Sequence, residues 1–435
     1  MADKFVLILL DGLGDRSYPE LGHKTPLQAA DTPFLDELAK NGCNGLFHAS
    51  IQGQALPSEN AHFAMFGYRP EDFPGRGALE ALGAGINLNP DEVAVLANLV
   101  SIAEENGCLK LVKEKVRTDD SQFEQAFARV SEFTAQGISL KLIPYKGSFA
   151  IIVLDGSVSP YITDSHPIVE GRFLQKVKPW KEYDKHEPSI RTALVLNEYL
   201  SWVFRTLSNA EQGQSAVPVP YNLNGLITQR AGRLKQIVPF TEKFGLRGVS
   251  VSSGAVYFGL CRYLGLDHLP GEENCDPGKE ISLRVRQAAD ILDEYDFVHI
   301  HSKAPDEAAH AKDPMLKMKN IEKLDKGLAA SLTGIVKRKD VVLAVTSDHS
   351  TPSKGVMVHS GEPVPLIICG SRVRIDRVDK FNEVAAAAGG LGFVHGREFM
   401  YIVLNYLDRG KLAGLMDTPH DQPYWPGKSE PFELV

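Results

Sequence analysis

The sequence predicts an α/β fold in which parallel strands form a central sheet. Uninterrupted apolar runs such as 4–10 and 341–346 are typical of strands that are buried on both faces. Helix, strand and helix patterns alternate from residue 240 onward, which is a βαβ rhythm. Polar residues follow directly after several apolar runs, where open α/β sheets place their functional sites. We expect a smaller α+β domain to be inserted into this core.

The composition excludes several classes of protein. The chain has 435 residues, of which 43% are hydrophobic and 23% are charged, so it is long enough for two globular domains. A net charge of −8 argues against a nucleic-acid surface and against an anionic membrane surface. Five cysteines without a CxxC pair favour free thiols in a reducing compartment. No basic leader and no apolar stretch of ~20 residues is present, so the predicted location is the cytoplasm.

The first predicted strand, 4–10, ends at Asp11-Gly12-Leu13-Gly14. This GxG lacks the third glycine of a dinucleotide fingerprint, which excludes a Rossmann nucleotide site. Asp11 could cap a helix or a turn. It could also bind a metal ion at the carboxyl end of its strand.

Two helix starts and a polar loop follow. Thr25-Pro26 and Thr32-Pro33 each predict a cap followed by proline at the first helical position. The loop 50–62 contains Ser58, at what looks like another helix start. A serine there is usually an N-cap. The alternative is a nucleophile that a metal ion and the positive end of the helix activate.

A glycine-rich segment, 67–86, contains two arginines. Gly75-Arg76-Gly77 could bring a guanidinium group and backbone amides close to an anion. Arg69 lies just before it. The alternative is a simple turn before a short helix.

The inserted domain is predicted at 98–180, and the core at 1–97 and 181–435. Asn106-Gly107 indicates a hairpin turn. An amphipathic helix is expected at 121–136 and two strands at 138–157, a module typical of a cap or substrate domain. Residues 212–220 are expected to form a flexible or crossover segment.

Two further predicted strands end in potential metal ligands. The strand at 297–301 leads into Lys303, Asp306 and His310, and the D-x-x-x-H spacing puts both side chains on one helix face. The strand at 341–346 leads into Asp348-His349, with His359 a loop later. Carboxylate and imidazole groups are usual ligands of divalent metals, and burying them without a partner is costly.

These strand ends should meet at one edge of a parallel sheet. Together they supply enough ligands for two metals, which a few ångströms apart (~3.5–4 Å) suit displacement at phosphorus. The attacking group would be a serine alkoxide, so a covalent phosphoserine would form. The candidate ligands are Asp11, Asp306, His310, Asp348, His349 and His359, with Ser58 as a possible seventh.

Several motifs resemble the cofactor-independent phosphoglycerate mutases, in their archaeal-type branch within the alkaline phosphatase superfamily. The matching stretches include LDGLGDR, GHKTPLQAADTPFLDELA, PSENAH, GYRPEDFPGRGALEALGAGI, HSKAPDEAAH and VTSDHSTP, and the resemblance covers nearly the whole chain. It implies an alkaline-phosphatase-like parallel-sheet core with an inserted α+β domain that holds the substrate.

The resemblance also implies the roles of site residues. One Mn²⁺ or Zn²⁺ ion, or Mg²⁺, would be held by Asp11, Ser58, Asp348 and His349, and a second by Asp306, His310 and His359. Ser58 would become phosphorylated, and Lys303 would stabilise the phosphoryl group as charge builds up on it. No 2,3-bisphosphoglycerate would be needed. The expected partner is a small phosphorylated substrate, and no particular oligomeric state is predicted.

The chain departs from the family pattern in the insert. Leu96 stands where the family usually has an arginine, and Lys146 is the best counterpart of a second one. The segment 164–168 reads DSHPI where the family often has DTDPH. Asp164 or His166 could serve as a general base. Substrate contacts are expected from Arg69, Arg76 and Lys146, with Arg172 as a further possibility.

The predicted activity is interconversion of 2- and 3-phosphoglycerate. Because arginine forks suit a carboxylate and a phosphate, their loss also fits a less anionic acceptor. The alternatives are therefore a kinase for a small hydroxy amino acid such as homoserine, or a phosphomonoesterase. A non-catalytic metal-binding protein is disfavoured because every ligand position and the serine are present.

Overall fold

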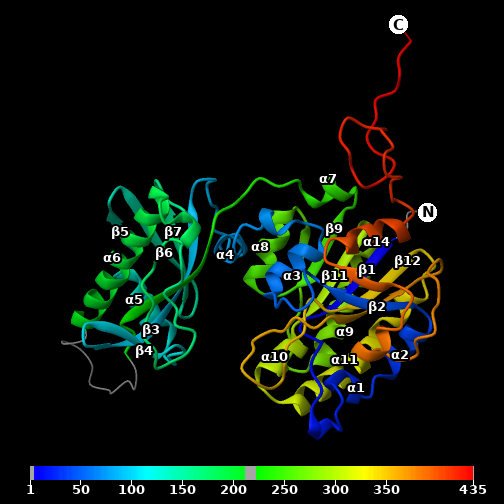
Figure 1. The fold of residues 1–435 in the computed structure, drawn as a ribbon, viewed down its shortest axis with the longest axis horizontal. Helices are drawn as coiled ribbons and strands as arrows, with labels where there is room; N and C mark the ends of the chain where they lie inside the picture. The colour runs from blue at the N-terminus through cyan, green and yellow to red at the C-terminus, as the bar shows by residue number, and fades with distance from the viewer. Residues whose placement is uncertain (1–3, 211–221, 435) are drawn as a thin grey trace. The chain divides into compact units, whose positions relative to one another are not determined.

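Strand β1 (Lys4–Leu10) lies in the interior of an eight-stranded sheet in the computed structural model, which describes residues 4–210 and 222–434. Figure 1 labels the elements. In sheet order the strands are β10 (Asp267–Pro270), β9 (Gly248–Ser252), β11 (Phe297–Ser302), β1, β12 (Val341–Thr346), β13 (Val364–Cys369), β2 (Cys43–His48) and β14 (Gly392–His395).

The five strands from β10 to β12 are parallel, which confirms the predicted parallel-sheet core. Leu10 pairs with Ser302 of β11, and Leu9 pairs with Thr346 of β12. The three strands therefore end at one edge, as the sequence predicts. β13 runs antiparallel to both of its neighbours, so the sheet is mixed on this side.

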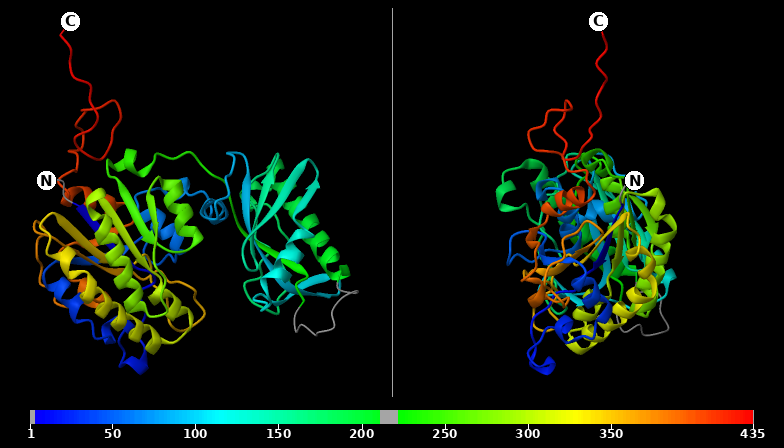
Figure 2. Two further views of the ribbon diagram at one scale, coloured as in Figure 1. Left: turned by 180° about the vertical axis from the view of Figure 1, so that it is seen from behind. Right: turned by 90° about the vertical axis from the view of Figure 1, so that its right-hand side faces the viewer.

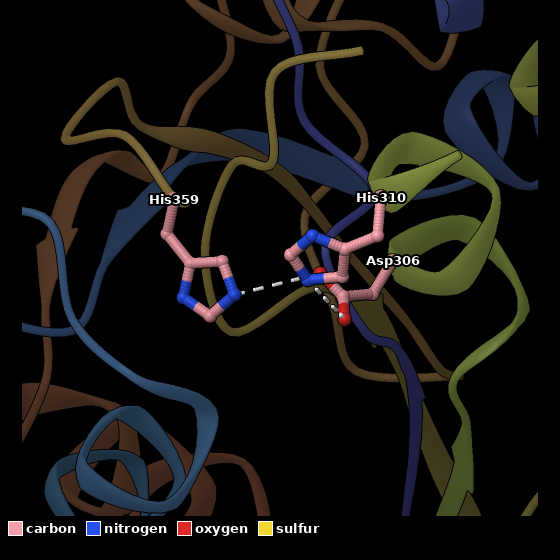
Figure 3. Close-up of side chains that lie close together, drawn as sticks. All are labelled: Asp306, His310 and His359. Carbon is pink, nitrogen blue, oxygen red and sulfur yellow. Dashed lines mark ion pairs between the residues drawn. The ribbon is translucent and has the colours of Figure 1, made fainter. Parts of the chain in front are cut away.

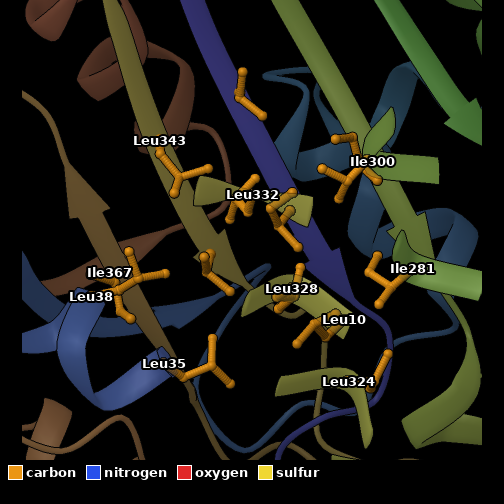
Figure 4. Packing of buried hydrophobic residues seen from close by; sticks show 14 of the residues in the cluster. Leu10, Leu35, Leu38, Ile281, Ile300, Leu324, Leu328, Leu332, Leu343 and Ile367 are labelled. Atoms are coloured by element: carbon orange, nitrogen blue, oxygen red, sulfur yellow. The ribbon is translucent and has the colours of Figure 1, made fainter. Parts of the chain in front are cut away.

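Helices cover both faces of this sheet. One face carries α1 (Pro26–Ala29), α2 (Pro33–Lys40), α9 (Pro277–Ile291), α11 (Pro314–Ser331) and α12 (Thr333–Val336). Their leucines and isoleucines pack against alternate residues of the central strands (Figure 4). Figure 2 shows α9 and α11 side by side in this layer. The opposite face packs aromatic rings: Phe5 of β1 contacts Phe399 of α14 (Glu398–Tyr406).

Other short elements complete this unit. They are α3 (Ser58–Met65), α7 (Phe240–Phe244), α10 (Ala304–His310), α13 (Glu383–Ala386), η1 (Pro19–Leu21), η2 (Pro70–Asp72) and η5 (Leu292–Glu294). Within the described ranges, no helix combines the length and the apolarity that crossing a bilayer requires.

A second compact unit has its own antiparallel sheet, in the order β4-β3-β7-β6-β5, with β8 paired to β3. Helices α5 and α6 share its main core, and α4 packs on the other side of β3 and β7. Its elements are α4 (Arg76–Gly83), β3 (Val93–Glu105), β4 (Cys108–Lys113), α5 (Asp120–Ala128), β5 (Glu132–Ala135), β6 (Ile138–Lys146), β7 (Phe149–Asp155), η3 (Lys181–Tyr183), α6 (Glu187–Ala210) and β8 (Gly225–Gly232). Helix α8 (Ala255–Leu264) has residues in both units.

The second unit is larger than the inserted domain expected at 98–180. It spans Pro74–Gln236 and Ala255–Gly259, and the first unit comprises Met1–Phe73, Ile237–Gly254 and Leu260–Val435. The reason is packing: Val195, Leu196 and Tyr199 of α6 lie in the same apolar cluster as β6 and β7. The predicted flexible or crossover segment 212–220 falls outside the described residues.

The helix expected at 121–136 is shorter than predicted. It ends at Ala128, and β5 follows as an edge strand on β6. Phe133 of β5 packs against Tyr199 and Trp202 of α6. This long-range contact favours a strand over a continued helix. The hairpin at Asn106-Gly107 is confirmed, with both residues at positive φ between β3 and β4.

Candidate metal centre

Asp11 is buried immediately after β1, with a relative exposure of 1%. Its Oδ1 lies 3.4 Å from the Ser58 hydroxyl and 3.4 Å from His349 Nε2. Its Oδ2 lies 3.1 Å from His301 Nε2. The carboxylate therefore faces a serine and two imidazoles that come from three other parts of the chain.

Ser58 is the first residue of α3, and Pro57 occupies the N-cap position. Ser58 is therefore not the N-cap, and its hydroxyl lies 2.9 Å from His349 Nε2 and 3.4 Å from Asp11 Oδ1. The structure thus removes the usual explanation for a serine at a helix start. What remains is a hydroxyl that is directed at acidic and imidazole side chains.

Asp348 and His349 follow β12, and the backbone orients them. Asp348 Oδ1 accepts hydrogen bonds from the N–H groups of Gly12 (3.1 Å) and His349 (3.0 Å). Asp348 Oδ2 is buried and makes no hydrogen bond of good geometry within the described ranges, although His349 Nε2 and His62 Nδ1 lie 3.3 and 3.4 Å away. A buried carboxylate oxygen left in this way fits a metal ligand.

The protonation states also fit metal binding. Burial, opposed by the charge of Asp348, lowers the pKa of His349 to about 4. Burial alone would raise the pKa of Asp348, but His349 and His62 hold it well below its ordinary value. At neutral pH the site therefore offers a neutral imidazole and an ionised carboxylate, which are the forms that bind a metal ion.

Asp306, His310 and His359 form a second group (Figure 3). Asp306 Oδ2 lies 3.2 Å from His310 Nε2, one turn further along α10. Asp306 Oδ1 lies 3.6 Å from His359 Nε2, and the Nδ1 of His359 is 2.7 Å from the Leu56 carbonyl. Lys303 occupies the N-cap position of α10, at the start of this group.

The two groups are neighbours. The rings of His349 and His359 stack with their centroids 3.8 Å apart. Within each group of three, the candidate ligand atoms lie within 4.8 Å of one another. Carboxylate oxygens and imidazole nitrogens suit Mn²⁺ and Zn²⁺. The donors present therefore fit two divalent cations, in the grouping that the family resemblance implies.

Comparison with known proteins agrees with this donor set. The model of a family described as the metalloenzyme superfamily matches residues 3–406. The chain belongs to the metalloenzyme superfamily.

Relatives with higher sequence identity show which branch of the superfamily the chain belongs to. The chain is 37% identical to the 2,3-bisphosphoglycerate-independent phosphoglycerate mutase 2 of Methanocaldococcus jannaschii, over 99% of both chains. It is 33% identical to the 2,3-bisphosphoglycerate-independent phosphoglycerate mutase of Methanopyrus kandleri, over 93% of this chain and 97% of the relative. Membership of the archaeal-type cofactor-independent mutases, predicted from the motifs, is confirmed.

Two solved structures resemble the chain along its length. One is a protein from Pyrococcus horikoshii, with a TM-score of 0.76, 29% identity and coverage of 95% of this chain and 100% of that one. The other is the cofactor-independent phosphoglycerate mutase of Thermoplasma acidophilum, with a TM-score of 0.62, 29% identity and coverage of 93% and 100%. The predicted fold class is confirmed.

Sequence reasoning missed two histidines behind this metalloenzyme site. His301 contacts Asp11, and His62 Nδ1 lies 2.8 Å from the Ser58 carbonyl and 3.4 Å from Asp348 Oδ2. Both are buried. A signal was present, since His62 lies four residues after Ser58, and a histidine in a fully buried strand is unusual. Such contacts orient metal ligands.

The predicted substrate residues lie in different surroundings. In the first unit, Arg69 pairs with Asp72 at 3.1 Å and is largely exposed. In the second unit, Arg76 pairs with Glu80 at 2.5 Å. Lys146 is exposed at the turn between β6 and β7. Existing ion pairs reduce the charge that the two arginines can offer to an anion.

The predicted general-base residues, Asp164 and His166, lie close to each other in the second unit. Asp164 Oδ1 accepts a hydrogen bond from the backbone N–H of Arg230 at 2.7 Å. Burial raises the pKa of Asp164, although Arg230 and His166 oppose the shift. His166 Nε2 lies 3.4 Å from Glu114, and His166 Nδ1 is 2.7 Å from the N–H of Ile168. Arg230 is a cationic neighbour of Asp164 that the sequence did not single out.

Proposed function

We propose that this chain interconverts 2- and 3-phosphoglycerate through a phosphorylated Ser58, with two divalent metal ions and without 2,3-bisphosphoglycerate. The observation that carries the proposal is the position of the Ser58 hydroxyl, 2.9 Å from His349 and 3.4 Å from Asp11 inside the candidate metal centre. The two relatives to which the chain is 37% and 33% identical are named as phosphoglycerate mutases, which supports the choice of substrate.

The chemistry proceeds in two displacements at phosphorus. Bound divalent cations would promote ionisation of the serine hydroxyl and neutralise charge on the phosphoryl oxygens. In the first displacement Ser58 Oγ bonds to phosphorus, and the bond from phosphorus to the substrate oxygen breaks. Glycerate then reorients, and its other hydroxyl attacks phosphoserine and regenerates Ser58. Lys303, at the start of α10, stabilises charge on the transferred group.

Proton transfer and substrate binding are assigned to the second unit. Asp164 or His166 gives a proton to the departing glycerate oxygen and takes one from the attacking hydroxyl. Burial raises the pKa of Asp164, and this shift toward the protonated form supports a role in proton transfer. The cations proposed for the carboxylate and phosphate are Arg69, Arg76 and Lys146, and Arg230 is added because it lies beside Asp164.

One observation favours a second candidate. Leu96 is buried against Ala81 and Ile151, so its position in the second unit contributes to packing and offers no cation. A site with fewer arginines also fits a less anionic acceptor, such as a hydroxy amino acid phosphorylated from ATP. The second candidate is therefore a homoserine-type kinase with the same serine chemistry.

A substrate screen separates the two. The purified protein with Mn²⁺ or Zn²⁺ is incubated with 3-phosphoglycerate, and separately with ATP and homoserine, and products are followed by ³¹P NMR. The mutase proposal predicts 2-phosphoglycerate without added 2,3-bisphosphoglycerate. ATP consumption without any 2-phosphoglycerate would favour the kinase, and hydrolysis alone would indicate a phosphomonoesterase.

Ser58→Ala tests the covalent step. We expect turnover to fall by at least about a thousandfold, because the phosphoryl acceptor is lost. Ser50→Ala is the matched control, because the Ser50 hydroxyl donates to Gln54 Oε1 in the neighbouring loop. Mass spectrometry of quenched wild-type protein should find phosphate on the peptide that contains residue 58. Full activity in Ser58→Ala would exclude this mechanism.

A further inference from the structure

Lys317 is a fully buried lysine on α11, with a relative exposure of 0%. Its Nζ donates to the carbonyls of Gly14 (2.8 Å) and Thr351 (2.9 Å) and to Asp15 Oδ2 (3.2 Å). An ammonium group has three protons, so these acceptors use all of them. Each acceptor belongs to a loop that carries candidate metal ligands.

Asp15, the ion-pair partner of Lys317, also connects the loop after β1 with the loop after β12. It accepts hydrogen bonds from the Tyr18 hydroxyl (2.6 Å) and from the hydroxyl (2.5 Å) and N–H of Ser353. Ser353 lies in the loop that follows His349, whereas Asp15 lies in the loop that follows Asp11. The ion pair of Asp15 and Lys317 therefore holds the loops after β1 and β12 against α11.

Thr351 links the two ligand groups directly. Its hydroxyl donates to Asp306 Oδ1 at 2.7 Å and lies 3.1 Å from His349 Nδ1. Because a hydroxyl has one proton, it must accept a hydrogen bond from Nδ1–H of His349. This fixes the tautomer of His349 so that its Nε2 lone pair faces Ser58, Asp11 and Asp348.

We propose that Thr351 and Lys317 are positioning residues that hold the two metal-ligand groups at a set spacing and orientation. Neither side chain binds the metals in this scheme: the ammonium group of Lys317 is cationic, and the Thr351 hydroxyl is used between Asp306 and His349. The inference rests on the two-metal centre of the proposed function. It adds that the two metal sites are coupled through one hydroxyl group.

If Lys317 and Thr351 had a purely structural role, their replacement would lower stability without changing metal binding. Removing Lys317 takes the counter-ion from the buried Asp15 carboxylate and one donor from each of two carbonyls, which would destabilise any protein. Stability loss alone therefore cannot decide the question. The deciding readout is the pair of metal ions, because positioning residues typically change metal affinity about 10- to 100-fold.

The experiment uses Mn²⁺ titration followed by electron paramagnetic resonance. We expect wild-type protein to bind two Mn²⁺ ions with a spin-coupled spectrum. Thr351→Val, which keeps the volume and removes the hydroxyl, should weaken the second Mn²⁺ about 10- to 100-fold and alter the coupling. Thr351→Ser should restore both, and Lys317→Met should show the same defect as Thr351→Val.

Asp325→Ala is the matched control on the same helix. Asp325 is buried and accepts hydrogen bonds from the backbone N–H groups of Leu35 and Phe34, away from the ligand loops. It should lose stability yet bind both Mn²⁺ ions as the wild type does. Thr351→Val with wild-type affinities and spectrum would overturn the inference even if Lys317→Met fails to fold.

The same experiments distinguish a failure of the proposed function from a failure of this inference. Two coupled Mn²⁺ ions in a wild-type protein that makes no 2-phosphoglycerate would refute the mutase proposal and leave the inference standing. Fewer than two bound ions in the wild type would overturn both.

Discussion

Asp15, Asp376 and Asp348 are carboxylates with three different surroundings. Asp15 pairs with the ammonium group of Lys317, and Asp376 accepts hydrogen bonds from several N–H groups. Asp348 differs, because its Oδ2 is buried and makes no hydrogen bond of good geometry in the part of the chain that the structure describes, with two imidazole nitrogens 3.3 and 3.4 Å away. A charge in that position is costly unless a cation joins it. This contrast is the residue-level argument for a metal at Asp348.

Asp376 allows a test of pH dependence away from the metal centre. It accepts hydrogen bonds from the N–H groups of Asn44 (2.6 Å), Gly390 (2.8 Å) and Val378 (3.0 Å). Burial would raise its pKa, but these hydrogen bonds hold the pKa below its ordinary value. Asp376→Ala should lower the free energy of unfolding by about 2 kcal/mol at neutral pH.

The depressed pKa fixes the sign of the pH effect. The stabilisation is fully present above the ordinary carboxyl pKa and is lost as pH falls through the lower pKa of the folded state. Urea unfolding at decreasing pH should therefore show the wild type and Asp376→Ala converging. Asp379→Ala, an exposed carboxylate three residues away, should change stability by less than about 0.5 kcal/mol. A difference that grows on acidification would contradict the assignment.

At the scale of elements, two glycines bring α9 and α11 together. A Cβ atom on Gly327 would lie 2.2 Å from the carbonyl oxygen of Gly278, which is closer than side chains approach. The backbones of α9 and α11 are therefore in direct contact at this crossing. Because of this close contact, α11, which carries Lys317, can pack beside α9 on the sheet.

Gly327→Ala should destabilise the protein although alanine favours a helix. The propensity gain is about 1 kcal/mol, and the clash with Gly278 should outweigh it, for a net loss of about 1–3 kcal/mol. Gly334→Ala in α12 is the matched control, because nothing lies within 4 Å of its Cβ position. Thermal unfolding of both variants measures the contrast. Equal stability of the two variants would show that the helices can separate without cost.

At the scale of the whole molecule, the candidate metal ligands all belong to one of two units. The first unit holds all seven, from Asp11 to His359, although the second unit interrupts its chain after Phe73. Each unit has its own apolar core. Metal binding should therefore stabilise the first unit selectively, because a ligand stabilises the structure to which it binds.

Hydrogen exchange with and without a chelator tests this expectation. Removing the metals should raise exchange in the peptides around Asp11, Asp306 and His349, where carboxylates lose their counter-ions. Strands β6 and β7 of the second unit should keep their protection. The metal contribution should approach about 2.7 kcal/mol when the free metal concentration is 100 times Kd. Equal loss of protection in both units would contradict the assignment of the metals to one unit.

The sequence by itself determined the three central strands β1, β11 and β12 and the candidate ligands that follow them. Long apolar runs identify buried strands; Asp11 follows such a run directly, and Asp348 and Asp306 follow two others within two and four residues. Because neighbouring parallel strands end at one edge, three local patterns sufficed to predict a common site. The family motifs supplied the grouping of the ligands into two sets.

Only the tertiary structure decided the contacts between distant segments. Lys317 has the sequence context of an ordinary helix lysine, and its partners are Gly14, Asp15 and Thr351. The place of α6 in the second unit was also not predictable, because an amphipathic helix does not specify which sheet it covers. Both features depend on the packing of residues far apart in the chain, whereas periodicity reports only each segment's own structure and its buried face.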